Sequence, residues 1–303
     1  MYAIEIVDLE KTYVKGMMRR PVKAVAGISL QVSLGEAFGF VGPNGAGKSS
    51  TIKILMGLAR PSAGKVRLFG ADAADPASRH RVGYVPENPC LYDYLTPREI
   101  LQMSLRLHGF KPESVHDQAG SWLARLGIGD VGDAPVRSFS KGMTQRVAIA
   151  QAMCVQPRLL ILDEPLSGLD PLGRREVVDL LSEYKKQGGT LFFTSHVLHD
   201  VERLADRFGL IQSGTLRSVR SPAELVGNEE VVMIRSKGRL PLDGWREESA
   251  GQWVIDSPRS GLWACLDTLR EHGHQLLEVR PSLSLELAFL QALERPTEKT
   301  GKS

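Results

Sequence analysis

Short apolar runs alternate with stretches of helical periodicity along the first 220 residues of the chain. Residues 4–9 alternate apolar and polar side chains, as a half-buried strand does. Further strand-like runs cover residues 37–41, 159–163, 190–194 and 208–212, and residues 50–58 have the pattern of a helix. Strands that alternate with helices predict a largely parallel sheet covered by helices, so the expected fold class is α/β.

A helical stretch interrupts this pattern and is expected to form a subdomain at about residues 90–155. Thr96 is suited to cap a helix, because Pro97 follows at the first helical position and Glu99 at the third. One face of this helix is predicted to carry Leu101, Leu105 and His108. A second helix is indicated around residues 122–126.

The pattern changes near Arg220-Ser-Pro-Ala223, where we place a domain boundary between residues 1–220 and 221–303. The second part contains three of the four tryptophans. Its apolar runs predict strands at residues 231–234, 253–255 and 276–279 and helices at residues 262–272 and 283–293. A small α+β accessory domain is therefore expected to follow the larger α/β domain.

The composition is that of a soluble globular protein, with 42% hydrophobic and 24% charged residues among 303. No apolar run approaches the roughly 18 residues that a membrane-spanning helix needs. The first residues show no basic start and no apolar signal core, so we expect the protein to stay in the cytoplasm. The three cysteines, Cys90, Cys154 and Cys265, are too few and too far apart for a disulfide framework or a zinc site.

Positive charge is concentrated in the first part of the chain. Residues 1–220 contain 28 Lys and Arg against 22 Asp and Glu, whereas residues 221–303 contain 10 against 13. A mild positive excess suits an anionic ligand or membrane surface and is too weak to indicate nucleic acid. The basic residues 14–23 are expected to form the solvated tip of a hairpin, with contact to lipid headgroups or a partner as the alternative.

A glycine-rich segment between a predicted strand and a predicted helix matches the phosphate-binding loop pattern. Its glycines let consecutive backbone N–H groups turn toward a phosphate at the positive end of the following helix. Lys48 can reach the β- and γ-phosphates, and the Ser49 hydroxyl can ligate Mg²⁺. The nucleotide-binding residues predicted here are Gly42, Pro43, Asn44, Gly45, Ala46, Gly47, Lys48, Ser49 and Ser50.

Two acids end the most apolar strand, Leu159-Leu-Ile-Leu-Asp163-Glu164. A strand of this kind delivers Asp163 to the Mg²⁺ shell beside a phosphate loop. Glu164 stands one residue further on, where it can polarise a water for in-line attack on the γ-phosphate. We therefore predict that Asp163 is a metal ligand and that Glu164 is catalytic.

Between these motifs, Ser140-Lys-Gly-Met-Thr-Gln-Arg146 resembles the signature motif of ABC-type ATPases. Four other positions match motifs of the same family in the same order along the chain. They are the adenine-stacking aromatic, the Q-loop residue, the D-loop and the switch histidine, here Tyr13, Glu87, Ser167-Gly-Leu-Asp170 and His196. The resemblance covers about residues 1–220 and implies a P-loop NTPase core with a helical subdomain.

The resemblance also implies a role for each of these residues. Tyr13 would stack on the adenine of ATP. Ser140 and Gly142 would begin a helix that contacts the γ-phosphate held by a second ATPase subunit, and Asp170 would help to join the two subunits. His196 would contact the γ-phosphate and hold the attacking water together with Glu164. Two chains would thus enclose two ATP molecules with Mg²⁺.

Three positions depart from the usual family pattern and are similar to those of ATPase subunits in ABC-2-type exporters. Glu87 stands where the Q-loop glutamine is usual, Lys141 replaces a glycine and Met143 replaces a glutamine. Glu87 is a further candidate Mg²⁺ ligand, directly or through water. The segment Ser284-Leu-Glu-Leu-Ala-Phe-Leu290 resembles the end of some exporter ATPases, for which dimerisation or regulation is the favoured role and simple packing the alternative.

The implied function is ATP binding and hydrolysis that power an exporter through separate membrane-spanning permease subunits. The chain would then be peripheral, on the cytoplasmic face of the inner membrane. Residues 87–107 are the expected docking surface, with Tyr92, Tyr94 and Leu95 either in that contact or in the core. The alternatives are a soluble ABC ATPase that acts on nucleic acid or ribosomes, and a non-catalytic nucleotide binder. The intact Lys48, Asp163, Glu164 and His196 oppose the second alternative.

Overall fold

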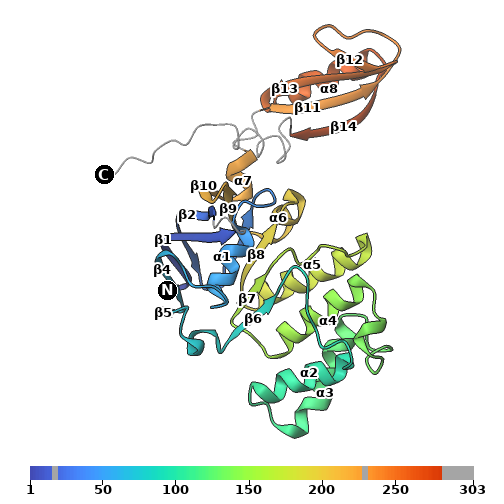
Figure 1. Ribbon diagram of the computed structural model, residues 1–303. Helices are drawn as coiled ribbons and strands as arrows, with labels where there is room; N and C mark the ends of the chain where they lie inside the picture. The colour runs from blue at the N-terminus through green and yellow to red at the C-terminus, as the bar shows by residue number, and fades with distance from the viewer. Residues whose placement is uncertain (16–19, 227–230, 282–303) are drawn as a thin grey trace. The chain divides into compact units, whose positions relative to one another are not determined.

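The computed structural model describes residues 1–15, 20–226 and 231–281, which divide into two compact units (Figure 1). The first unit comprises residues 1–219, and the second begins at Arg220. Each unit contains a hydrophobic core of its own.

A six-stranded sheet of order β10-β9-β3-β8-β7-β6 forms the centre of the first unit. Neighbouring strands from β9 to β6 run parallel. β3, β7 and β8 are buried along their whole length, which explains why their sequences read as continuous apolar runs. The strands are Ala37–Val41 (β3), Val82–Val85 (β6), Leu159–Leu162 (β7), Thr190–Ser195 (β8), Arg207–Gln212 (β9) and Thr215–Arg220 (β10). The predicted parallel, covered sheet is confirmed.

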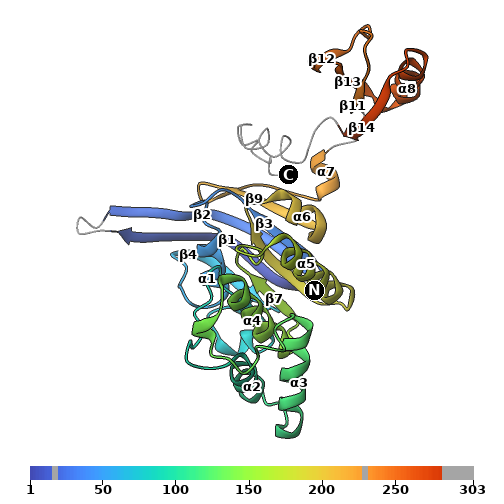
Figure 2. The same cartoon turned by 90° about the vertical axis from the view of Figure 1, so that its right-hand side faces the viewer.

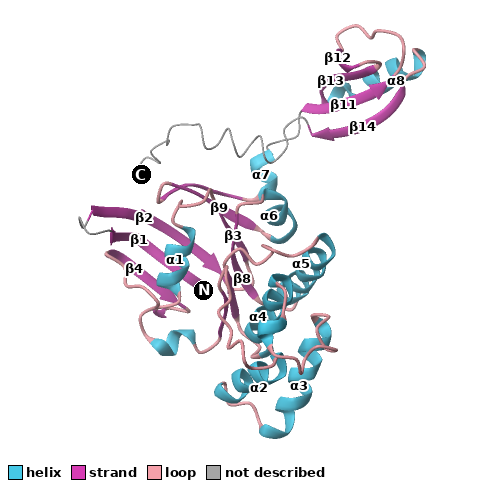
Figure 3. Cartoon of the chain, turned by 45° about the vertical axis from the view of Figure 1, so that its right-hand side comes forward, coloured by secondary structure: helices cyan, strands magenta, loops and turns pink. Residues whose placement is uncertain are grey.

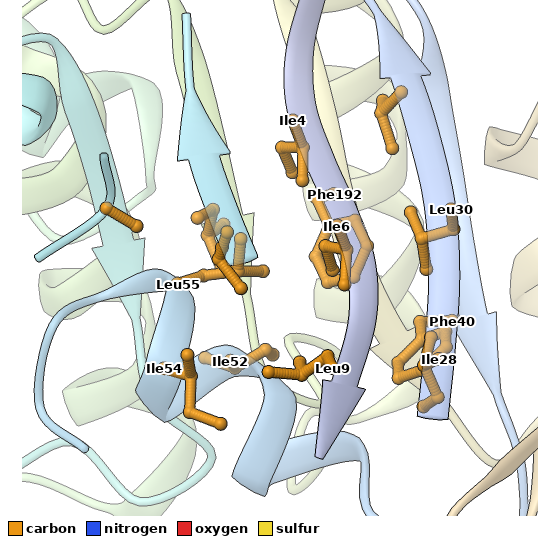
Figure 4. Packing of buried hydrophobic residues seen from close by; sticks show 14 of the residues in the cluster. Ile4, Ile6, Leu9, Ile28, Leu30, Phe40, Ile52, Ile54, Leu55 and Phe192 are labelled. Carbon is orange, nitrogen blue, oxygen red and sulfur yellow. The ribbon is translucent and has the colours of Figure 1, made fainter. Parts of the chain in front are cut away.

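A second, antiparallel sheet has the order β2-β1-β4-β5 and lies on one side of the first (Figure 3). Helix α1, Lys48–Leu55, contributes Ile52, Ile54 and Leu55 to a core that it shares with strands of both sheets (Figure 4). Helices α4, α5 and α6 lie on the other side of the parallel sheet. The antiparallel strands are Tyr2–Lys15 (β1), Arg20–Ser33 (β2), Ala63–Leu68 (β4) and Ala71–Asp72 (β5).

The hairpin of β1 and β2 is longer than the sequence pattern predicted. Both strands have 14 residues, and they remain paired as far as Val14 opposite Pro21 and Lys15 opposite Arg20 (Figure 2). The prediction of a loop over residues 14–23 was therefore wrong at both of its ends, because backbone pairing continues where the apolar alternation stops. Residues 16–19 lie outside the described residues.

The helical stretch forms α2, Pro97–Leu107, α3, Pro112–Arg125, and α4, Lys141–Cys154. The predicted cap is confirmed, since the Thr96 hydroxyl accepts from the Glu99 N–H and the Glu99 carboxylate accepts from the Thr96 N–H. Leu101 and Leu105 are buried as expected. His108 is not on the buried face, because the helix ends before it and its side chain is exposed. Helices α5, Pro171–Lys186, and α6, Leu198–Leu204, follow.

The second unit is built on an antiparallel sheet of order β12-β13-β11-β14. Its core joins strand and helix residues, among them Ile234, Val232 and Leu269. Strand β12 was not predicted, because its sequence Arg-Glu-Glu-Ser carries no apolar alternation and all four residues are exposed. The elements are Pro222–Val226 (α7), Val231–Lys237 (β11), Arg246–Ser249 (β12), Gln252–Pro258 (β13), Leu262–Glu271 (α8) and Gln275–Pro281 (β14). The helix predicted at residues 283–293 lies outside the described residues.

A fragment of residues 1–220 is predicted to fold without the rest of the chain. Every residue of the larger core lies before residue 220, so the fragment retains all the apolar contacts of that core. We expect a single cooperative thermal transition by circular dichroism. A fragment that ends at residue 204 is the control, since it lacks β9 and β10 and should not unfold cooperatively. A broad transition of the 1–220 fragment would show that the boundary is misplaced.

Candidate functional site

The glycine-rich loop connects the carboxyl end of β3 to the first turn of α1. Gly47 has φ of 111°, a conformation that side chains strongly disfavour, and a Cβ there would lie 2.5 Å from the Ala24 carbonyl oxygen. A Cβ at Gly42 would collide with the backbone of Ile211. The loop is therefore packed closely on one side, and its other side faces an open cleft.

The cleft has a volume of about 810 Å³. Most of the residues predicted from the motifs line it, namely Tyr13, Pro43, Asn44, Gly45, Ala46, Gly47, Lys48, Ser49, Ser50, Glu87, Glu164 and His196. The lining also includes Val22, Lys23, Ala24, Lys53, Leu58, Ala59 and Ser167. Val22 and Lys23 of β2 were missed because residues 14–23 were predicted as a loop, whereas in the hairpin Val22 pairs with Tyr13.

Lys48 is the buried cation at the base of the cleft, with 6% of its surface exposed. Its ammonium donates hydrogen bonds to the Gly42 carbonyl oxygen at 2.6 Å and to the Pro43 carbonyl oxygen at 3.4 Å. It also lies 3.3 Å from Oε1 of Glu164. Carbonyl oxygens of the glycine-rich loop thus accept hydrogen bonds from the lysine of the same loop, and the lysine ammonium also faces the buried carboxylate of Glu164.

Glu164 is held on both sides of its carboxylate. Oε2 lies 2.8 Å from Nδ1 of His196, and Oε1 faces the ammonium of Lys48. Among the described residues, Oε1 accepts no hydrogen bond of normal geometry, although it is buried. The backbone of Glu164 has φ of 50°, which costs a residue with a Cβ about 1–3 kcal/mol. Oε1 is thus an acceptor beside the lysine ammonium, to which a water molecule could donate a hydrogen bond.

Asp163 is buried one residue earlier and is reached by a residue that the motifs did not single out. The Thr194 hydroxyl donates to Oδ1 of Asp163 at 2.7 Å and accepts the backbone N–H of Glu164 at 2.9 Å. Burial and the nearby charge of Asp163 raise the pKa of Tyr84 to about 12. Asp163 is 4% exposed and does not line the cleft, but it adjoins Glu164, which does.

Tyr13 is half-buried on the β1 side of the cleft. Its ring has the Lys11 ammonium 4.9 Å from its centroid, a cation–π contact. A planar aromatic face is thus presented at the end of the cleft that the β1–β2 hairpin forms.

Five predicted site residues do not line this cleft. Gly42 and Asp163 lie directly beside lining residues in the chain, whereas Ser140, Gly142 and Asp170 come from other parts of it. Ser140 caps α4 and accepts the Met143 N–H at 3.3 Å, and Asp170 caps α5 and accepts the Gly173 N–H at 3.0 Å. The two helix starts adjoin, because the alkyl chain of Lys141 covers the position where Gly168 would carry a side chain. The structure therefore brings the signature and D-loop together, but not onto the phosphate loop of the same chain.

Sequence comparison finds relatives of this chain among ABC transporter ATP-binding proteins. Residues 25–167 match the family model described as "ABC transporter". An uncharacterized ABC transporter ATP-binding protein of Synechocystis is 37% identical, over 97% of this chain and 82% of that protein. The daunorubicin/doxorubicin resistance ATP-binding protein DrrA of Streptomyces peucetius is 32% identical, over 98% of this chain and 94% of that protein.

A solved structure supports the fold independently. The dimeric ATP-binding cassette MJ0796, in a post-hydrolysis state with ADP and Pi, superposes with a TM-score of 0.67 at 23% identity, over 72% of this chain and 98% of that one. The two relatives align along nearly the whole chain, and the glycine-rich loop and the buried Lys48–Glu164 pair agree with that alignment. The chain therefore belongs to the family of ABC transporter ATP-binding proteins, which are ATPases.

Proposed function

We propose that this chain hydrolyses ATP between two of its copies and that the cycle drives an exporter of the ABC-2 type. The observation that carries the proposal is the contact of Glu164 with both Lys48 and His196 at the base of the cleft. These side chains come from α1, the end of β7 and the end of β8, and the parallel sheet delivers all three to one edge. The similarity to DrrA, a daunorubicin/doxorubicin resistance protein, supports the export direction.

ATP would occupy the cleft with its adenine on Tyr13 and its phosphates in the glycine-rich loop. The loop residues present backbone N–H groups at the start of α1, where the helix dipole favours anions. Lys48 now donates to carbonyl oxygens of its own loop, and these contacts would be exchanged for oxygens of the β- and γ-phosphates. These hydrogen bonds hold the Lys48 ammonium beside the position that the β- and γ-phosphates would occupy.

The residues present fit a magnesium ion. Ser49 and Glu87 line the cleft, and Asp163 lies buried beside Glu164, so the available donors are the hard oxygens that Mg²⁺ prefers. Mg²⁺ usually binds through one or two carboxylates, waters and substrate phosphates, so a larger ligand cluster is not required. When bound, the ion would neutralise charge on the β- and γ-phosphate oxygens. Ser49 and Asp163 would hold it, and Glu87 would reach it directly or through water.

Glu164 would act as the base in hydrolysis. A water oxygen attacks the γ-phosphorus, its proton passes to the Glu164 carboxylate, and the bond from phosphorus to the ADP oxygen breaks. The buried Oε1, which accepts no hydrogen bond among the described residues, is suited to accept that proton. His196, 2.8 Å from Oε2, would fix the carboxylate and contact the γ-phosphate from the cleft side.

A second copy would complete the site. Ser140, Gly142 and Asp170 lie outside the cleft of their own chain, and the α4 start leaves N–H groups for an anion. In a dimer they would face the γ-phosphate in the partner's cleft and contact the partner chain. The dimeric state of the MJ0796 cassette supports this arrangement.

Transport would need separate membrane subunits. In the parts of the chain that the structure describes, no helix has the length and apolar character to cross a bilayer. The core alternative for Tyr92 and Tyr94 was wrong, because their exposed fractions are 55% and 65%. The two rings lie 5.9 Å apart, between Glu87 and α2. We assign this aromatic pair to the contact with a permease on the cytoplasmic face of the membrane.

The C-terminal unit keeps an accessory role in this proposal, in dimerisation or regulation. A role on nucleic acid or ribosomes is less favoured, because the relatives named above are transporter or resistance proteins.

Glu164→Gln is predicted to retain ATP binding and to lower turnover about 100- to 1,000-fold, because the amide cannot take the proton of the attacking water. ATP should then accumulate the closed dimer, seen by size-exclusion chromatography with saturating ATP. Glu183→Gln, which changes an exposed acid on α5, is the control and should leave turnover unchanged. A monomer at saturating ATP, or turnover near that of the wild type, would contradict the proposed site.

The double variant Tyr92→Ala with Tyr94→Ala is predicted to release the protein from membranes. Loss of both rings removes the aromatic area that anchors such contacts, so at least about tenfold more protein should appear in the soluble cell fraction. ATPase activity of the purified variant should stay within about twofold, since neither ring lines the cleft. Tyr2→Ala, at another exposed tyrosine, serves as control. Unchanged membrane association would exclude this docking surface.

A further inference from the structure

We propose that Thr194 is a positioning residue that holds Asp163 and Glu164 in the relative orientation that hydrolysis needs. The inference rests on the proposed function and adds to it a residue that the sequence motifs did not assign. Its basis is one buried hydroxyl that contacts both acids, with Thr194 0% exposed, Asp163 4% and Glu164 9%. Each of the three is thus shielded from water that could replace the contact.

The register of the sheet places Thr194 beside the acids. In the parallel pair of β7 and β8, Leu162 stands opposite Phe193, so the next residues along, Asp163 and Thr194, emerge side by side. Thr194 is the fifth of the six residues of β8, and His196 follows the last one, 2.8 Å from Oε2 of Glu164. Ser195 between them turns away and bonds to the Val197 backbone instead. Thr194 therefore contacts Asp163 and Glu164, and His196 adds a second contact to Glu164.

The two hydrogen bonds use both capacities of a hydroxyl. The Thr194 oxygen accepts the N–H of Glu164 at 2.9 Å, and its proton is donated to Oδ1 of Asp163 at 2.7 Å. An aliphatic side chain of the same shape would leave a buried N–H and a buried carboxylate oxygen without these partners. Removal of one partner from such a buried pair is costly, and more so where one group is charged.

The contact also supports a strained backbone. Glu164 has φ of 50°, in the left-handed region. Its backbone N–H donates a hydrogen bond to the Thr194 hydroxyl oxygen. Without the hydroxyl, the peptide between Asp163 and Glu164 is free to rotate toward a relaxed conformation. Rotation of this peptide moves the carboxylate of Glu164 away from Lys48 and His196 and reorients that of Asp163. Thr194 should therefore affect both the response to Mg²⁺ and the rate of hydrolysis.

The test compares Thr194→Val with Thr194→Ser in the full chain. For Thr194→Val we expect kcat to fall about 10- to 100-fold, the loss of a hydrogen bond to a charged group. Binding of a fluorescent ATP analogue in EDTA should stay within about threefold, since the phosphate loop is untouched. The Mg²⁺ concentration that half-maximally enhances analogue binding should rise about tenfold or more. Thr194→Ser keeps the hydroxyl and should restore all three values.

Thr190→Val is the matched control on the same strand. Thr190 is also buried, at 1% exposed, and its hydroxyl accepts the N–H of Gly35 at 3.0 Å, away from the acids. This variant should lose thermal stability as Thr194→Val does, but keep kcat and the Mg²⁺ response. If Thr194→Val does not fold, Thr194→Ala against Thr194→Ser makes the same comparison, because that pair differs only in the hydroxyl.

The outcomes separate this inference from the proposed function. A wild-type protein without ATPase activity would refute the proposed function itself. A wild-type protein that hydrolyses ATP, with Thr194→Val equal to it in kcat and Mg²⁺ response, would overturn only the role of Thr194. Equal losses in Thr190→Val and Thr194→Val would also overturn it, since they would show that the effect is general destabilisation of β8.

Discussion

The buried carboxylate of Glu164 is the constraint on which the site depends. A charge taken out of water is costly unless it is paired and hydrogen-bonded, and here the Lys48 ammonium and His196 supply that compensation. The same groups are the ones that a nucleotide and its attacking water would use. The Lys48 and Glu164 charges thus compensate one another, and a bound phosphate would exchange one partner for another.

The parallel sheet makes this arrangement possible. Carboxyl ends of adjacent parallel strands meet at one edge, and β3, β7 and β8 deliver to that edge the phosphate loop, the two acids and the pair of Thr194 and His196. The continuous apolar sequence of these strands is the consequence of burial on both faces. Polar residues gather at the carboxyl ends of these strands, and the residues of the candidate site are among them.

The sequence was informative wherever a local pattern has a local cause. The Thr96–Glu99 cap, the strand 37–41 and the loop before Lys48 are specified by neighbouring residues, and all three were predicted at their observed positions. Contacts between residues far apart in the chain could not be predicted from the sequence in the same way. Thr194 contacts Asp163 from 31 residues away, and only the register of two strands brings them together.

Other differences have equally physical reasons. The β1–β2 hairpin extends through polar residues because backbone hydrogen bonds continue without apolar alternation, and Val22 reaches the cleft for this reason. β12 is held by its pairing with β13 and has no apolar pattern of its own. The sequence could not decide whether Tyr92 and Tyr94 lie in a docking contact or in the core, because an aromatic ring suits either place, and the structure shows both exposed.

The central claim is that ATP is bound between two copies, with Lys48 from one and Ser140 from the other. It is tested most directly by mixing donor- and acceptor-labelled chains, both Glu164→Gln, of which one also carries Lys48→Ala and the other Ser140→Arg. Neither chain can form an intact site with itself, but the mixed pair has one. We predict energy transfer that depends on ATP in the mixture and none within either variant alone. Transfer within one variant alone, or none in the mixture, would contradict the shared site.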